Sequence, residues 1–346
     1  MTAEAEVTDR RLLGLRAETL THLRAAGLVP GDVARVVRAA LEEDFRYGAD
    51  VTSAATVAGR TVSASVVARE AGVLAGGPVA LAVFDLLADY LGRGPSAVSA
   101  DGIAMAPLSD ETRNGSGGGT PAADQGAPVT ATVLLADGAR VSAGDAVLRV
   151  SGDAVAVLGA ERTMLNFLTH LSGIASATRA WADAVAGTGT VVRDTRKTLP
   201  GLRVLEKYAV RCGGGENHRM GLGDAALVKD NHVAAAGGIG AAVRAVRAAA
   251  QPGLVIEVEC DTVDQVREAL AEGARFILLD NMPVPVMREA VVVARAYDGV
   301  RLEASGGLRL SNAREVAATG VDYLAVGGLT HSSRALDLGL DYSGTA

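Results

Sequence analysis

The feature that most constrains the fold is a series of short apolar runs in the second half of the chain. The runs begin roughly 22–35 residues apart, and helical patterns lie between most of them. Strands that alternate with helices at this spacing predict right-handed βαβ units and a parallel sheet. Such strands are nearly continuous in apolar residues because helices cover both faces of the sheet. The six runs are Val191–Thr195, Ala226–Asn231, Leu254–Cys260, Phe276–Asn281, Val300–Gly307 and Tyr323–Gly328.

Polar residues gather at the C-terminal end of each run. Parallel α/β barrels carry their active sites at that end of the strands. An open doubly wound sheet also uses its strand ends, but mainly near one switch point. Nearly every run contributes here, which favours a barrel, and six clear runs indicate an incomplete one. The strand-end residues are Asp194, Thr195, Lys229, Asp230, Asn231, Glu257, Glu259, Asp280, Asn281, Glu303, Ser305, Gly306, Gly307, Gly327 and Gly328.

The first half of the chain follows different patterns. Residues 1–47 read as helices and residues 61–75 alternate like a strand. Residues 109–127 are rich in Gly, Ser and Pro and contain no Lys, so we interpret them as a flexible insertion rather than a phosphate loop. Residues 130–160 predict short strands like the hairpin of biotinyl or lipoyl carriers. The modified Lys of such carriers is absent, so a non-enzymatic carrier or interaction module is the weaker alternative.

Composition excludes several classes of protein. The net charge is −7, which argues against general nucleic-acid binding. No run approaches the length of a membrane span, and the charged N-terminus does not resemble a signal peptide. The two cysteines show no zinc-site spacing and suit a reducing compartment, so we expect a cytoplasmic protein.

The stretch Asp194–Asn231 concentrates positive charge. It contains seven Lys and Arg against five Asp and Glu, within an acidic chain. Arg196 with Lys197, and His218 with Arg219, can bind carboxylate or phosphate groups, and Lys229 ends an apolar strand. A solvated basic surface and an ordinary loop histidine are the alternatives. The pattern predicts a site for a small, multiply anionic substrate.

Carboxylates and glycine turns complete the predicted mouth of the barrel. Glu257 and Glu259 share one face of a strand and, with Asp280, offer the oxygen ligands that Mg²⁺ prefers. An ion-pair network with Lys229 and the arginines is the alternative, and the two are compatible. Ser305–Gly307 and Gly327–His331 follow the last two strands, where barrels commonly bind phosphate through backbone N–H groups.

Long motifs with these features resemble the quinolinate phosphoribosyltransferase family, also called nicotinate-nucleotide pyrophosphorylase (carboxylating). They include DTRKTLPGLRVLEKYAVRCGGGENHRMGLGDAALVKDNH, EVEC, LLDNM, EASGGL and DYLAVGGLTHSSRALDLGLDY. EEDFRYGADVTSAATV and ERTMLNFLTHLSGIAS extend the resemblance into the first half. The resemblance covers nearly the whole chain, and the insertion near 109–127 departs from the family pattern.

The resemblance implies an incomplete, seven-stranded parallel α/β barrel at residues 171–331. An N-terminal α/β sandwich domain would occupy residues 1–170, with residues 332–346 returning to it. It also implies a homodimer with shared active sites, in which Arg162 of the ERT motif reaches the neighbouring subunit's site.

The resemblance also assigns roles to residues of this chain. The carboxylate-binding set would be Arg162, Arg196, Lys197, His218, Arg219 and Lys229, of which Lys197 and Lys229 are also catalytic, and Thr195 would bind substrate. Glu259 and Asp280 would hold Mg²⁺ and act in catalysis next to the ribose. The phosphate-binding set would be Ser305, Gly306, Gly307, Gly327, Gly328 and His331.

The implied activity is a phosphoribosyl transfer in NAD biosynthesis. The enzyme would join 5-phosphoribosyl 1-pyrophosphate to quinolinate and release pyrophosphate and CO₂, giving nicotinate mononucleotide. A paralogous phosphoribosyltransferase acting on nicotinate or another aromatic acid is the alternative. The surplus of cations favours quinolinate, which has two carboxylates.

Overall fold

The computed structural model describes residues 13–93 and 128–345, so the insertion 109–127 lies outside the described residues. The chain divides into two compact units, Met1–Thr169 with Asp337–Ala346, and His170–Leu336. The sequence placed the corresponding boundaries near residues 170 and 332. No helix in the described ranges combines the length and the hydrophobicity that a membrane crossing requires.

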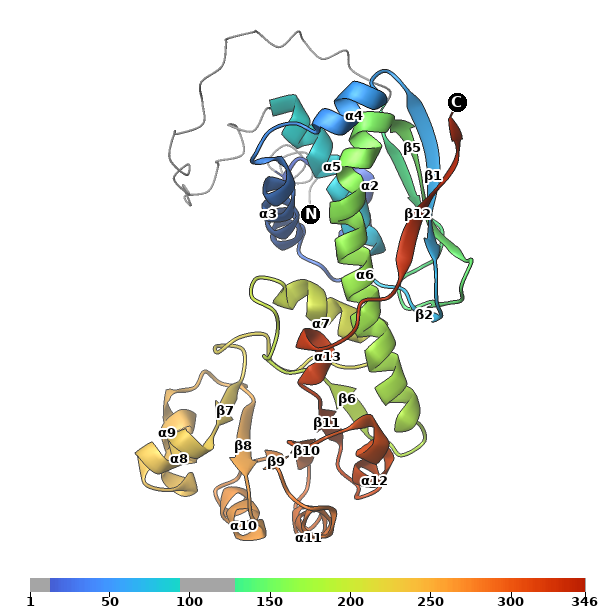
Figure 1. The fold of residues 1–346 in the computed structure, drawn as a ribbon. Helices are drawn as coiled ribbons and strands as arrows, with labels where there is room; N and C mark the ends of the chain where they lie inside the picture. The colour runs from blue at the N-terminus through green and yellow to red at the C-terminus, as the bar shows by residue number, and fades with distance from the viewer. Residues whose placement is uncertain (1–12, 94–127, 346) are drawn as a thin grey trace. The chain divides into compact units, whose positions relative to one another are not determined.

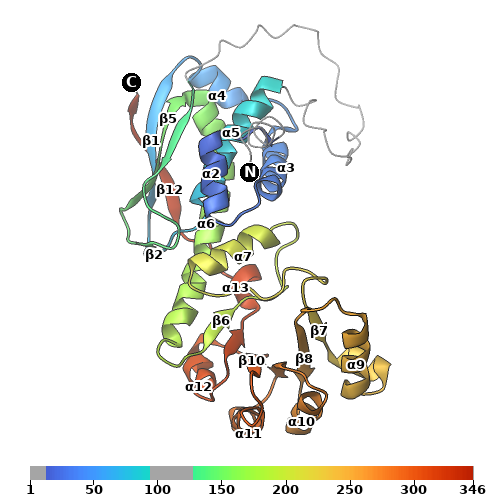
Figure 2. The ribbon, with the colours of Figure 1, turned by 180° about the vertical axis from the view of Figure 1, so that it is seen from behind.

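The first unit is an antiparallel sheet with helices packed on one side (Figures 1 and 2). Its strand order is β12-β1-β5-β3, so the C-terminal strand pairs with the first. Alternate residues of β1 are buried, which is the pattern of a sheet with one face against a core. The strands are β1 (Thr61–Ala68), β3 (Thr130–Val133), β5 (Ala146–Asp153) and β12 (Leu338–Thr345), with the short pair β2 (Gly72–Val73) and β4 (Arg140–Val141). The helices are α2 (Ala17–Ala25), α3 (Pro30–Phe45), α4 (Val51–Thr56) and α5 (Gly77–Arg93).

Residues 130–160 do not form a separate module. β3 and β5 belong to the same sheet as β1 and β12, and helix α6 (Ala154–Ala184) begins directly after β5. The hairpin patterning of the sequence is therefore real, but its strands are committed to the core of the first unit. The carrier alternative loses its structural basis.

The second unit contains a curved parallel sheet of six strands in the order β6-β11-β10-β9-β8-β7. All six apolar runs of the sequence form its strands, which confirms the prediction of an incomplete α/β barrel. They are β6 (Val191–Arg193), β7 (Ala226–Val228), β8 (Ile256–Cys260), β9 (Phe276–Asp280), β10 (Arg301–Ser305) and β11 (Tyr323–Ala325).

The seventh strand that the family resemblance implied is reduced to one bridge. Glu216 pairs with Arg193 in parallel, and Glu216 N donates to Val192 O at 2.9 Å. The three glycines before Glu216 limit this pairing, since glycine is a poor strand former. In the described ranges β7 pairs only with β8, so the sheet stays open between β7 and the Glu216 segment.

Helices cover the outer face of the curved sheet (Figure 1). Outward residues such as Val258, Cys260, Ile277 and Leu302 are fully buried beneath them. Residues at i and i+2 of a strand share a face, so the intervening residues point to the concave side. After α6, the helices of the second unit are α7 (Arg203–Cys212), α8 (Asp230–Ala236), α9 (Ile239–Ala249), α10 (Val263–Ala271), α11 (Val284–Ala294), α12 (Ala313–Ala317) and α13 (Gly328–His331), with the 3₁₀ turn η2 (Leu310–Asn312).

We predict that Gly173→Ala in helix α6 destabilises the second unit. Alanine normally favours a helix interior over glycine. A Cβ at residue 173, however, would collide with the carbonyl oxygen of Arg334. The expected loss is about 1–3 kcal/mol in the free energy of unfolding, the usual cost of overpacking. Urea unfolding followed by circular dichroism measures it.

The matched control is Gly31→Ala in helix α3, where a Cβ has nothing within 4 Å. It should leave stability unchanged or raise it by up to about 1 kcal/mol. Equal effects of the two substitutions would contradict the close approach at Gly173.

Candidate active site

The concave side of the second sheet carries a layer of buried charged side chains. Arg193 of β6 donates from Nη1 to Oε2 of Glu303 on β10 at 2.7 Å. Its guanidinium also lies over the ring of Tyr323, 4.7 Å from the centroid, and over Phe276 at 5.4 Å. Arg193 thus joins side chains from four strands.

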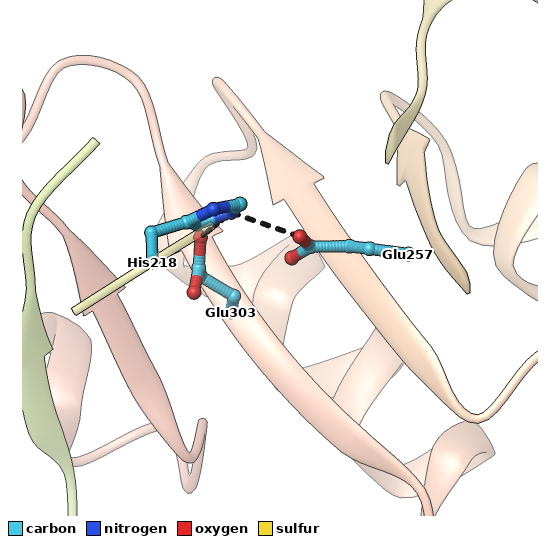
Figure 3. Close-up of side chains that lie close together, drawn as sticks. All are labelled: His218, Glu257 and Glu303. Carbon is cyan, nitrogen blue, oxygen red and sulfur yellow. Dashed lines mark ion pairs between the residues drawn. The ribbon is translucent and has the colours of Figure 1, made fainter. Parts of the chain in front are cut away.

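His218 lies between two buried glutamates of this layer (Figure 3). Its Nε2 is 2.9 Å from Glu257 and 3.4 Å from Glu303. Its Nδ1 accepts the backbone N–H of Arg219 at 2.7 Å. Because Nδ1 is an acceptor, the ring proton belongs on Nε2, which can then donate to Glu257. Burial lowers the pKa of His218, in agreement with this neutral tautomer.

The same three side chains offer ligand atoms within 4.8 Å of one another, a set that could hold a metal ion. The hydrogen bond to Nδ1 argues against that use. A metal at Nε2 of His218 would shift the ring proton to Nδ1, where it would face the N–H of Arg219. We therefore interpret His218, Glu257 and Glu303 as a hydrogen-bonded support beneath the barrel mouth.

Burial dominates the ionisation of both glutamates. Burial, and then the charge of Glu257, raises the pKa of Glu303 to about 7. Burial likewise raises the pKa of Glu257 to about 7, although the charges of Arg193 and Arg219 oppose the change. One oxygen of each carboxyl, Oε1, has no hydrogen-bond partner. Two neighbouring carboxyls in a buried layer are costly to ionise fully, even with arginines nearby.

A second buried pair, Lys207 and Asp194, fixes the segment that carries His218. Lys207 of α7 forms an ion pair with Asp194 and donates to the carbonyl oxygen of His218 at 2.8 Å. Asp194 also accepts the backbone N–H of His218 at 2.9 Å and the Nδ2 of Asn217 at 2.6 Å. Both side chains of the ion pair are at most 1 % exposed. The carboxylate therefore sets the position of the segment Glu216–Arg219 relative to the end of β6.

Two guanidinium groups repel each other at the mouth. Burial, and then the positive charge of Arg196, lowers the pKa of Arg219. Arg219 is held by a hydrogen bond to Ala225 O at 3.1 Å. Arg203 donates to Thr198 Oγ1 at 3.0 Å and so supports the Arg196 loop. Like charges held this close by the protein create a site that an anion stabilises.

Lys197 links this cationic wall to a glycine turn. A Cβ on Gly327 would lie 2.8 Å from Lys197 Cδ and 3.5 Å from Thr195 Oγ1. Thr330 Oγ1 donates to the carbonyl oxygen of Lys197 at 2.7 Å. A side chain at 327 would therefore displace the Lys197 side chain, which is exposed at the mouth.

Two partly exposed carboxylates end neighbouring strands. Glu259 of β8 and Asp280 of β9 repel each other: burial, and then the charge of Asp280, raises the pKa of Glu259, while Lys229 opposes this change. Lys229 is exposed at the end of β7. Two facing carboxylates that compete for one ammonium group form an electrostatic site suited to a small hard cation.

The glycine turn after β10 lies next to Asp280 in the sheet. Ser305 pairs with Asp280 in register, and Gly306 and Gly307 adopt φ of 81° and 62°. A Cβ built on Gly328, in the turn after β11, would meet no atom within 4 Å. His331 is exposed, and its Nδ1 lies 2.6 Å from Ser332 Oγ. The turn and the carboxylate together form one edge of the mouth.

Comparisons with known proteins place these residues in a family. The model of the quinolinate phosphoribosyl transferase C-terminal domain matches residues 174–341, and that of the N-terminal domain matches residues 118–172. A nicotinate-nucleotide pyrophosphorylase [carboxylating] of Mycobacterium leprae is 50% identical over 315 residues, 90% of this chain and 97% of that protein. The chain belongs to the quinolinate phosphoribosyltransferase family.

Two further relatives agree with this assignment. A probable nicotinate-nucleotide pyrophosphorylase [carboxylating] of Bacillus subtilis is 44% identical over 205 residues, 59% of this chain and 70% of that protein. The crystal structure of NadC from Streptococcus pyogenes superimposes with a TM-score of 0.75 at 35% identity, covering 92% of this chain and 99% of that one. The fold predicted from the strand pattern is therefore that of solved members of the quinolinate phosphoribosyltransferase family.

The structure brings most of the predicted site residues of this family member to one barrel mouth. Those that lie in the second unit are Thr195, Arg196, Lys197, His218, Arg219, Lys229, Glu259, Asp280, Ser305, Gly306, Gly307, Gly327, Gly328 and His331. Arg162 lies on α6 within the first unit and is exposed. Its role at a neighbouring subunit's site stays a prediction.

Sequence reasoning missed the buried support. Lys207 looks like an ordinary surface lysine of an amphipathic helix, and no local signal marks its burial. Glu303 was among the predicted strand-end residues, and Arg193 could have been found as well, because it stands two residues before Thr195 and so shares its face. The fully buried lysine of the site is Lys207, at 1 % exposure.

We predict that Glu303 makes the second unit less stable as the pH rises from about 4.5 to 7. Its folded-state pKa of about 7 lies above its ordinary value of 4.5. The folded state therefore binds this proton more tightly than the unfolded state does. The resulting contribution to the free energy of unfolding is fully present below pH 4.5 and is lost as the pH rises through 7. For one proton, the free energy of unfolding falls by at most about 1.4 kcal/mol per pH unit over this range.

Urea unfolding between pH 5 and 8 measures this slope through Trp181, the only tryptophan, which belongs to the second unit. Glu303→Gln is the comparison, because it keeps the shape and cannot ionise. The variant should gain stability relative to the original chain as pH rises. Parallel pH profiles of the two proteins would contradict the raised pKa.

Proposed function

We propose that this chain transfers the phosphoribosyl group of 5-phosphoribosyl 1-pyrophosphate to quinolinate, with loss of CO₂. The observation that carries the proposal is that one barrel holds two pairs of like charge at its strand ends: Arg196 and Arg219 between β6 and β7, and Glu259 and Asp280 on β8 and β9. The cationic pair suits a dicarboxylate and the carboxylate pair suits a developing cation. Family membership supports the same reaction.

The cationic wall binds and orients the acceptor in this proposal. Arg196, Lys197, Arg219 and Lys229 provide guanidinium and ammonium groups for the two carboxylates of quinolinate. His218 stays in the set as the residue that anchors Arg219, since both of its ring nitrogens have protein partners. Bound in this way, the pyridine nitrogen points toward the carboxylates across the mouth.

The carboxylate wall stabilises the transferred ribose. As the bond from C1 to pyrophosphate breaks, C1 gains positive character, and the negative charges of Glu259 and Asp280 offset it. The pyridine nitrogen then donates its electron pair to C1 and becomes a positively charged pyridinium. The 2-carboxylate leaves as CO₂, its electron pair stays on C2 beside the pyridinium nitrogen, and a proton completes nicotinate mononucleotide.

Mg²⁺ is the proposed cofactor. Glu259 and Asp280 fit it, because they are hard oxygen donors of like charge that face each other at a partly exposed position. Bound there, Mg²⁺ would neutralise charge on the departing pyrophosphate. The backbone N–H groups of Ser305–Gly307 and Gly327–Gly328, with His331, are the proposed cradle for the phosphates.

The proposed assembly is a homodimer with shared sites, and the proposed compartment is the cytoplasm. Arg162 is exposed on α6, where it is free to reach a second subunit. A chain with only two cysteines, Cys212 and Cys260, suits a reducing compartment.

An acceptor comparison tests the function. Quinolinate with 5-phosphoribosyl 1-pyrophosphate and Mg²⁺, without ATP, should give nicotinate mononucleotide and one CO₂ per turnover. Excess chelator should stop the reaction, and added Mg²⁺ should restore it. Turnover of nicotinate in place of quinolinate would assign the chain to the alternative acceptor class.

Arg196→Ala should lower kcat/KM for quinolinate by roughly 10- to 100-fold, the value of one or two charge-assisted contacts. The matched control is Arg267→Ala, an exposed arginine of α10 whose partner Glu289 is 3.8 Å away. Near-normal efficiency in both variants would make the Arg196 cluster an ordinary basic surface.

Subunit mixing tests the shared site. Arg162→Ala and Lys229→Ala should each be inactive, and mixtures should recover up to about a quarter of full activity, because half of the dimers are then mixed and each has one intact site. Arg196→Ala mixed with Lys229→Ala is the control and should recover nothing. Absence of recovery in the first mixture, with exchange demonstrated by mass spectrometry, would place Arg162 outside a shared site.

A further inference from the structure

Asn281 has the most unusual backbone of the barrel mouth. It follows Asp280 at the end of β9 and adopts φ of 51°. In the described part of the chain no other residue except glycine has a positive φ. A left-handed conformation costs about 1 kcal/mol or more for most side chains and is best tolerated by Asn and Asp. Backbone strain of this kind is concentrated at functional sites.

Three contacts of Asn281 join the two features on either side of it. Its backbone N–H donates to Ser305 O at 2.9 Å, so it continues the pairing of β9 with β10. Its Nδ2 donates to Asp280 Oδ2 at 2.7 Å. Its Oδ1 lies against Gly306, where a built Cβ would collide with it. One side chain therefore contacts both the carboxylate at the end of β9 and the glycine turn after β10.

The choice of residue follows from these contacts. Glycine would accept the left-handed conformation but has no group to reach Asp280 or Gly306. Aspartate would tolerate the conformation but would set a second negative charge beside Asp280 and lose the Nδ2 donor. The hydrogen bond is made to Oδ2 of Asp280, so it restricts the orientation of that carboxylate.

We infer that Asn281 is a positioning residue for the 5-phosphoribosyl 1-pyrophosphate half of the site. It holds the Asp280 carboxylate and the Ser305–Gly307 turn at a fixed separation, so that one substrate meets both at once. The inference rests on the proposed function, in which Asp280 serves the ribose and the metal while the turn serves a phosphate. Quinolinate binds on the opposite wall and does not depend on this separation.

The side chain is exposed, so its removal leaves no cavity in a core. A role in substrate positioning and a role in stability alone therefore give different results. Loss of positioning raises the KM for one substrate and weakens its equilibrium binding. Loss of stability alone lowers the unfolding midpoint and leaves both KM values unchanged.

The test uses Asn281→Gly and Asn281→Ala in the full-length chain. Asn281→Gly keeps the backbone conformation and removes the side chain, whereas Asn281→Ala removes the side chain and adds backbone strain. Both should raise the KM for 5-phosphoribosyl 1-pyrophosphate about tenfold, the value of one hydrogen bond to a charged group, and leave the KM for quinolinate within about twofold. Equilibrium binding of 5-phosphoribosyl 1-pyrophosphate with Mg²⁺, measured by calorimetry, should weaken by the same factor.

The control is Asn166→Ala, an exposed asparagine of α6, which should leave both KM values unchanged. A normal KM and normal binding in Asn281→Gly would overturn the inference, because the backbone alone would then suffice. An equal rise in both KM values would also overturn it. If the original chain does not turn over quinolinate, the proposed function fails first; if it does and the variants match it, only the role of Asn281 fails.

Discussion

The buried ion pair between Lys207 and Asp194 is the interaction on which the site depends. Asp194 ends the first strand of the barrel, and its carboxylate accepts from Lys207, from the backbone of His218 and from Asn217. Breaking a buried pair leaves an uncompensated charge and costs about 3–5 kcal/mol. The segment Glu216–Arg219 has almost no strand pairing of its own, because the bridge at Glu216 is isolated. The ion pair therefore replaces the sheet as its anchor.

The barrel is organised in layers of different polarity. Phe276 and Tyr323 lie beneath Arg193, whose guanidinium contacts both rings and pairs with Glu303. Two residues further along the strands come the groups of the mouth, since a strand repeats its facing side every two residues. Burying charged residues opposes folding unless they are paired. Here the pairing orients His218, and His218 in turn accepts from the backbone of Arg219.

Much of the fold and of the mouth was accessible from the sequence, for reasons that particular residues illustrate. Glu259 and Asp280 end apolar runs, and the ends of parallel strands meet at one edge whatever the details of packing. The position of the glycine turns at this edge followed from the same rule. Lys207 was inaccessible, because a lysine on an amphipathic helix is normally solvated and its burial depends on a carboxylate thirteen positions away in the chain. The tautomer of His218 likewise depends on its partners at both nitrogens, and one of them comes from a different strand.

By itself the sequence determined the fold class, the family and the set of residues at the strand ends, because apolar periodicity and motif order are local properties of a chain. Only the tertiary structure decided which charges are buried, which ones pair and how Asn281 joins Asp280 to the Gly306 turn. These outcomes depend on contacts between residues far apart in sequence and on backbone geometry at single positions. The cationic stretch from Asp194 to Asn231 illustrates this difference. Its excess of positive charge is visible in the sequence. Only the structure shows that Lys207 is buried against Asp194 while other cations of the stretch, such as Lys197, are exposed.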